Sequence, residues 1–230
     1  MKKILFTLLA LSYMLIANGL PNTITTTIAN LNTNGEIQLS NSVPVGMSGI
    51  VIHNYGNGLS AISHAVVSQG GSHASLHPYQ AILHENIPNI QTEAKVGDKV
   101  IFGNFYHNAL VIAPNQRAYQ AVTQQYQRTW VHPDAYALDF MKEGSKRLNV
   151  ESLKKFAQLN QVGLVLIVEE KSIRILDPIS QQFIGNIATS LPQGEPITPF
   201  YARFEEVGSS LFNFASKSYL PYFQSVAGLQ

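Results

Sequence analysis

The sequence contains no cysteine, and this absence removes several kinds of chemistry at once. Disulfide bonds, thiolate nucleophiles, iron–sulfur clusters and zinc sites with cysteine ligands all require thiols. The folded part of the chain must therefore be stabilised by its hydrophobic core. Hydrophobic residues make up 45% of the 230 residues, which is enough to build one.

Charged residues are also scarce, at 13% of the chain, and neither sign predominates. The chain has 15 basic and 14 acidic residues, and loss of Lys2 and Lys3 with an N-terminal leader would leave 13 basic residues against 14 acidic. A nucleic-acid-binding protein needs a basic patch that neutralises phosphates, and the sequence shows none. We therefore expect no nucleic-acid partner.

The first 19 residues have the features of a secretory signal peptide. Lys2 and Lys3 precede an apolar run from Ile4 to Ala17, and small side chains at Ala17 and Gly19 suit a signal peptidase site. We expect cleavage after Gly19 and export to the periplasm or the cell surface. The alternative is an uncleaved N-terminal anchor, because the run falls only a little short of the roughly 20 apolar residues that span a bilayer. No later run is long enough to predict a second span.

The remaining chain is predicted to be α+β, and its first part, residues 20–113, is predicted to be β-rich. Asn34-Gly35 and Asn57-Gly58 are dipeptides that favour two-residue hairpin turns. Short strands separated by such turns are typical of a small antiparallel β-barrel or sandwich. The expected strands are 23–31, 36–39, 45–55, 59–68, 74–83 and 109–113, and residues 96–102 are expected to form a turn that enters a further strand.

Residues 114–230 are predicted to form an α+β subdomain, with a three-stranded meander packed by helices. Asn115 is a suitable N-cap for the first helix, since its side chain can accept a backbone hydrogen bond. Because the connection near residues 113–117 is short, we expect the two subdomains to pack together as one unit. The expected helices are 115–125, 135–143, 149–159, 209–217 and 220–227, and the expected strands are 162–168, 172–176, 182–188 and 200–204.

Histidine is the residue type that most invites a metal site. Five of the seven histidines fall in one β-rich stretch: His53, His64, His73, His77 and His84. His73 and His77 have a spacing that brings two ligands together on a helix, but residues four apart on a strand lie about 13 Å apart. We interpret these histidines as rim or surface residues and expect no metal. A histidine-dependent metal enzyme is the weakest of our alternatives.

No motif for nucleophilic catalysis is visible. The sequence has no Gly-x-Ser-x-Gly elbow, and Ser48 is on a predicted strand. His64 and Asp98 could in principle join a serine, but most chains of this length contain such a trio. The adjacent carboxylates Glu169-Glu170 flank a strand, where neighbouring side chains face opposite ways. We therefore predict a protein that is not an enzyme and has no cofactor.

Two features are candidates for partner binding. Aromatic residues crowd the C-terminal part of the chain, where most are expected to be core residues. Four lysines place positive charge on two of the predicted helices: Lys142, Lys146, Lys154 and Lys155. We take these lysines as the candidate partner-binding residues, and a solvated face is the alternative interpretation.

Five segments resemble the N-terminal domain of the plasminogen-binding surface protein family of Helicobacter- and Campylobacter-type bacteria. They are residues 97–105, 109–119, 162–168, 173–176 and 198–204, and the resemblance spans about residues 30–225. It implies an exported cell-envelope or surface protein that binds a protein partner, either plasminogen or an envelope component, without enzyme activity. The alternative is a periplasmic scaffold component of an envelope or motility assembly.

The resemblance also implies a means of recognition. Plasminogen kringles bind lysine, especially at a C-terminus, and members of the family can carry a lysine-rich extension that ends in lysine. This sequence ends in Gly228-Leu229-Gln230. We therefore expect any plasminogen binding by this sequence to depend on internal lysines such as Lys154 and Lys155.

Overall fold

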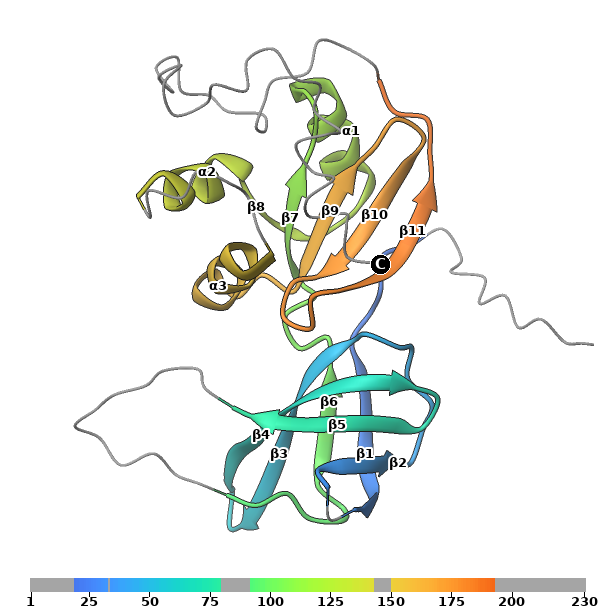
Figure 1. The fold of residues 1–230 in the computed structure, drawn as a ribbon, viewed down its shortest axis with the longest axis vertical. Coiled ribbons are helices and arrows are strands. Elements are labelled where there is room, and N and C mark those ends of the chain that lie inside the picture. The colour runs from blue at the N-terminus through green and yellow to red at the C-terminus, as the bar shows by residue number, and fades with distance from the viewer. Residues whose placement is uncertain (1–18, 33, 80–91, 143–149, 193–230) are drawn as a thin grey trace, which may run out of the picture.

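Two β-sheets and three helices make up the structure, a computed structural model that describes residues 19–32, 34–79, 92–142 and 150–192 (Figure 1). The first six strands close into a barrel and the next five form an open sheet. The larger hydrophobic core contains residues of both, among them Phe102 of the barrel and Leu166 of the sheet. The predicted signal peptide, the strand at 200–204 and the helices at 209–217 and 220–227 lie outside the described residues.

The barrel is antiparallel throughout and has the strand order β1-β2-β5-β4-β3-β6. It closes because β1 pairs with both β2 and β6, and β6 also pairs with β3. Asn57 and Gly58 both have positive φ, as expected of the hairpin turn between β3 and β4. The strands are β1 (Ile24–Leu31), β2 (Glu36–Leu39), β3 (Ser48–Gly56), β4 (Leu59–Gly70), β5 (His73–Pro78) and β6 (Lys99–Phe102).

The second sheet has the order β11-β10-β9-β7-β8. Its antiparallel part is the predicted meander, whereas β7 runs parallel to both of its neighbours, β9 and β8. The three-residue strand β8 has no counterpart in the sequence prediction. The strands are β7 (Asn108–Ile112), β8 (Thr129–Val131), β9 (Leu164–Val168), β10 (Ser172–Asp177) and β11 (Gln182–Ala188).

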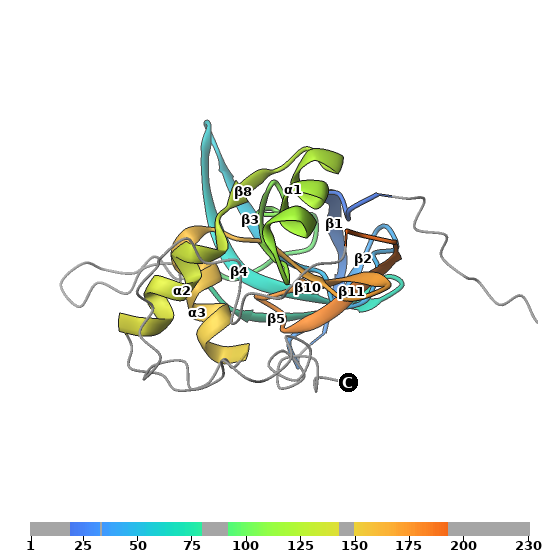
Figure 2. The same ribbon diagram turned by 90° about the horizontal axis from the view of Figure 1, so that it is seen from above.

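The three helices cover both faces of this sheet. Helix α1 (Gln116–Gln125) begins after Asn115, whose side chain accepts the backbone N–H of Ala118 at 3.0 Å, as predicted. Ala118 and Val122 of α1 belong to the core shared with the barrel. Helices α2 (Pro133–Lys142) and α3 (Val150–Asn160) contact each other and enclose a second core with the opposite face, centred on Leu153 and Phe156 (Figures 1 and 2).

The strand expected at 109–113 was placed in the wrong sheet by the sequence prediction. It is β7, which pairs with β8 and β9 instead of any barrel strand. Ala109, Leu110, Val111 and Ile112 are all fully buried, so this strand needs a covering layer on both faces. A barrel strand with a wet outer face would alternate apolar and polar residues, which this run does not. The subdomain division at residue 113 itself stays a prediction.

Candidate functional site

Helix α3 carries Lys154 and Lys155, the two candidate lysines whose side chains the structure describes. Leu153, Phe156 and Ala157 are buried against the sheet, which turns the opposite side of the helix to solvent. Lys155 is exposed and Lys154 is half-buried. Glu151 lies one turn before Lys155, the order in which an (i, i+4) ion pair supports a helix. The exposed side of α3 therefore presents lysine on a rigid element.

The other two candidate lysines are less well placed by the structure. Lys142 is the last residue of α2, and Lys146 lies outside the described residues. The α2 and α3 helices contact each other, so the backbone of Lys142 belongs to the same helical layer as Lys154 and Lys155. The structure does not test whether any of the four lysines binds a partner, and this role stays a prediction.

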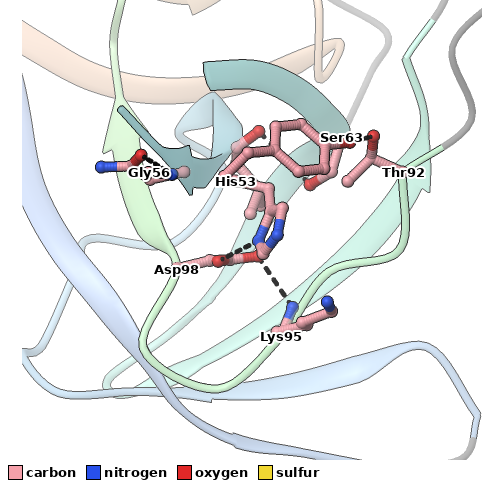
Figure 3. A network of polar contacts seen from close by, with 9 residues as sticks. His53, Gly56, Ser63, Thr92, Lys95 and Asp98 are labelled. Carbon is pink, nitrogen blue, oxygen red and sulfur yellow. Dashed lines mark hydrogen bonds and ion pairs between the residues drawn. The ribbon is translucent and has the colours of Figure 1, made fainter. Parts of the chain in front are cut away.

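A polar network that the sequence did not predict lies at one end of the barrel (Figure 3). His53 of β3 is buried, and its Nδ1 lies 2.7 Å from Oδ1 of Asp98. The second oxygen of Asp98 accepts the backbone N–H of Lys95 at 2.8 Å. The ring of His53 meets the ring of Tyr55 edge-on, with centroids 4.8 Å apart, and the Tyr55 hydroxyl is hydrogen-bonded to Thr92. This network fixes Tyr55, which is itself 53% exposed.

Among the residues that the structure describes, no other histidine is hydrogen-bonded to this network. Asp98 bonds to His53 and not to His64, so the trio considered from the sequence is not the arrangement found. His73 and His77 are exposed on β5, and His84 lies outside the described residues. Among the residues with described positions, no three His, Asp or Glu side chains come together in a way that could hold a metal ion.

A second buried polar cluster joins the barrel to the sheet. Asp177, at the end of β10, is completely buried. Its Oδ2 accepts the backbone N–H of Ser48 from the barrel at 2.8 Å and the Tyr106 hydroxyl at 2.7 Å. Its Oδ1 accepts the backbone N–H groups of Ile179 and Ser180 at 3.0 and 3.1 Å. Four donors thus satisfy one carboxylate, and two of them come from outside its own turn.

Burial acts on both acidic groups of this cluster. It raises the pKa of Asp177, an effect that the hydrogen bonds from Ser48, Tyr106 and Ser180 oppose. Burial, followed by the charge of Asp177, also raises the pKa of Tyr106 far above its ordinary value. Tyr106 therefore remains a protonated donor to Asp177 over the whole physiological range of pH.

This pKa shift predicts a loss of stability in alkaline solution. Above pH 10.0, the ordinary value for tyrosine, Tyr106 ionises in the unfolded chain but stays protonated in the folded one, so the folded state loses stability as pH rises. Ionisation of this one group in the unfolded chain lowers the free energy of unfolding by up to about 1.4 kcal/mol for each pH unit above 10. Tyr106→Phe should cost about 1 kcal/mol below pH 10 through the lost hydrogen bond. Urea denaturation at a series of pH values should show a shallower alkaline decline for Tyr106→Phe; an equally steep decline would contradict the assignment.

The described surface thus offers lysine on helix α3 and an ordered tyrosine at one end of the barrel. Residues 23–227 match the family described as plasminogen-binding protein pgbA N-terminal, and the chain belongs to this family. The match covers both the barrel and the second sheet, so the family relationship applies to the whole described fold.

Two curated relatives carry the name plasminogen-binding protein PgbA and come from two strains of Helicobacter pylori. Each is 23% identical to this chain over 167 residues, which cover 70% of this chain and 36% of the relative. The chain therefore matches about a third of the length of these relatives. No solved structure matches the chain. Within the described residues, no helix is both long and apolar enough to cross a membrane.

Proposed function

We propose that this chain is an exported, non-enzymatic protein of the cell envelope or surface that binds a protein partner, and that plasminogen is that partner. The family match over residues 23–227 carries the proposal, because it includes nearly all of the chain that follows the predicted leader. The relatives named as plasminogen-binding proteins supply the identity of the partner.

The geometry of α3 supports recognition through internal lysines. A kringle binds the ammonium group of a lysine, so the lysine must reach out from the surface on a scaffold that does not have to be ordered first. Lys155 is exposed, and α3 is anchored by the fully buried Leu153 and by Phe156. Lys154 adds a second ammonium group next to it in sequence. We infer that this pair forms the lysine site of the described part of the chain.

The direct test is binding of the purified chain to immobilised plasminogen by surface plasmon resonance, with the lysine analogue 6-aminohexanoic acid as competitor. We expect saturable binding that the analogue abolishes. The double variant Lys154→Ala/Lys155→Ala should raise the Kd by about tenfold, which corresponds to about 1.4 kcal/mol. Lys142→Ala/Lys146→Ala tests the other two candidate lysines in the same assay.

The matched control removes two exposed lysines from elsewhere on the chain. Lys99→Ala/Lys171→Ala changes the net charge by the same amount, in β6 and in the turn between β9 and β10, and should leave the Kd unchanged. An equal loss in both double variants would indicate a general charge effect and contradict a site on α3. Binding that 6-aminohexanoic acid does not compete would contradict lysine recognition, and absence of binding would contradict plasminogen as the partner.

A further inference from the structure

The exposed side of α3 carries a carboxylate as well as lysine. Glu151 and Lys155 are both exposed. They are four residues apart on the helix, so their Cβ atoms lie about 5–6 Å apart on the same side of it. Glu151 is the only acidic residue in the sequence of α3. One turn of the helix therefore presents a negative and a positive group side by side.

The carboxylate of Glu151 is oriented by a contact from outside its own helix. Gln181 lies in the turn between β10 and β11, and its Nε2 donates to Oε2 of Glu151 at 3.1 Å. This turn is itself fixed, because Asp177 accepts the backbone N–H of Ser180 at 3.1 Å and the Ser180 hydroxyl donates to the carbonyl of Gly46 at 2.6 Å. A group that is ordered before binding loses little conformational entropy when a partner contacts it.

The preference of kringles for a C-terminal lysine indicates that recognition involves two charges. A lysine at a C-terminus carries an ammonium group on its side chain and a free carboxylate on its main chain. The analogue 6-aminohexanoic acid carries the same two groups at opposite ends of a short alkyl chain. A lysine inside a chain has lost that carboxylate to the peptide bond. It therefore reproduces the whole ligand only where a side-chain carboxylate lies close to its ammonium group.

We propose that Glu151 and Lys155 together imitate a C-terminal lysine, with Glu151 supplying the carboxylate that an internal lysine lacks. This inference rests on the proposed binding of plasminogen and names the second group through which α3 is recognised. The two opposite charges complement a kringle site that accepts an ammonium group and a carboxylate at once. Other polar contacts of these two side chains do not prevent this, because ion pairs at an exposed surface contribute little and can be exchanged for contacts with a partner.

Lys155 suits this pairing better than Lys154. Both lysines lie within about one turn of Glu151, but Lys155 is exposed, whereas Lys154 is half-buried. An ammonium group that enters a site on a partner must extend away from its own surface. Lys155→Ala should therefore weaken binding to immobilised plasminogen more than Lys154→Ala does, and the reverse order would contradict the pairing of Lys155 with Glu151.

Glu151→Gln tests the role of the carboxylate, because it removes the charge and keeps the size of the side chain. In surface plasmon resonance on immobilised plasminogen, this variant should raise the Kd by about fivefold, since the kringle loses one of two charged contacts. Glu36→Gln is the matched control: it removes one negative charge from an exposed position in β2 and should leave the Kd unchanged. Thermal unfolding of both variants should match that of the wild type, which separates loss of recognition from loss of the fold.

The direction of the change in Kd decides between two roles for Glu151. A lower Kd for Glu151→Gln would mean that the carboxylate shields the ammonium group of Lys155, and this would overturn the proposal. An unchanged Kd would overturn it as well, because the carboxylate would then make no contact with plasminogen.

A double-mutant cycle with Lys155→Ala shows whether the two groups act as a unit. If one kringle site receives both, Glu151→Gln should change the Kd by less than about twofold in the Lys155→Ala background. An equal loss in both backgrounds would show that Glu151 acts apart from Lys155, which would overturn the proposal and leave plasminogen binding in place. Absence of binding by the wild type would contradict the proposed function itself, and the imitation of a C-terminal lysine with it.

Discussion

Replacing Asp177 with alanine is expected to lower the free energy of unfolding by about 3–5 kcal/mol, the range for removing one side of a buried, charged hydrogen-bond network. The carboxylate is completely buried and accepts four hydrogen bonds. Without it, the backbone N–H groups of Ser48, Ile179 and Ser180 and the hydroxyl of Tyr106 lose their acceptor. Each unsatisfied buried group costs about 1–3 kcal/mol, although water in the space left by the side chain would recover part of this.

Urea denaturation followed by circular dichroism at neutral pH measures this loss. The free energy of unfolding of Asp177→Asn should lie between those of the wild type and Asp177→Ala. An amide keeps one acceptor oxygen, but its NH₂ group then faces other hydrogen-bond donors. The control is Glu169→Ala, which removes a partly exposed carboxylate whose ion pair with Arg174 spans 3.8 Å. The free energy of unfolding of Glu169→Ala should differ from that of the wild type by no more than about 0.5 kcal/mol. A loss below about 1 kcal/mol for Asp177→Ala would refute a structural role for the cluster.

Gly163→Ala is expected to lower the free energy of unfolding by about 3 kcal/mol, which is the upper part of the range for overpacking a close contact. Gly163 lies between α3 and β9, and its N–H donates to the carbonyl of Asn108 at 3.0 Å. A Cβ atom at this position would lie 2.4 Å from the carbonyl carbon of Phe105. The obstacle is backbone, so it cannot rotate away, and the segment that links the barrel to β7 would have to shift.

The control for this change is Gly35→Ala in the turn between β1 and β2. Gly35 has a φ of +81°, and apart from the glycine itself and its two chain neighbours no heavy atom lies within 4 Å of the position that a Cβ would take. Its replacement should cost about 1 kcal/mol through the unfavourable backbone conformation alone. Gly163 is not among the glycines with positive φ, so its cost is steric. Equal losses of stability in the two variants, measured by thermal unfolding, would argue against the close contact at Gly163.

Local signals in the sequence were sufficient to predict most of the elements. The Asn57-Gly58 turn and the Asn115 cap act within a few residues, and both formed as their side-chain and backbone chemistry requires. The placement of β7 was wrong because sequence order suggested that it continues the barrel. Which sheet a strand joins is decided by partners far away in the chain, and β9, the partner of β7, begins only at Leu164. The strand β8 was missed because three residues carry almost no periodicity.

Neither the His53–Asp98 network nor the cluster around Asp177 was predicted from the sequence, because each joins residues that are far apart in the chain. An Asp-Pro pair such as Asp177-Pro178 is typical of a turn, but the carboxylate of Asp177 also accepts the backbone N–H of Ser48, which is 129 residues away. His53 and Asp98 are 45 residues apart and meet only because β3 and β6 are neighbours in the barrel. A charged residue directly after the apolar run of β10 was the one signal that could have pointed to the junction. The lysines of α3 were recognisable because a helix places them by its period alone.

The topology of the two sheets also bears on the order in which this chain can fold. All six barrel strands lie between Ile24 and Phe102, so the barrel can close as soon as that stretch of the chain has been synthesised. Strand β7 emerges next, but its hydrogen-bonding partner β9 follows about fifty residues later. Until then, Ala109 to Ile112 remain an apolar segment without a neighbour on that side. Because late, non-local pairing slows folding and exposes unpaired strands to aggregation, we expect the pairing of β7 with β9 to be the slow step in folding of this chain.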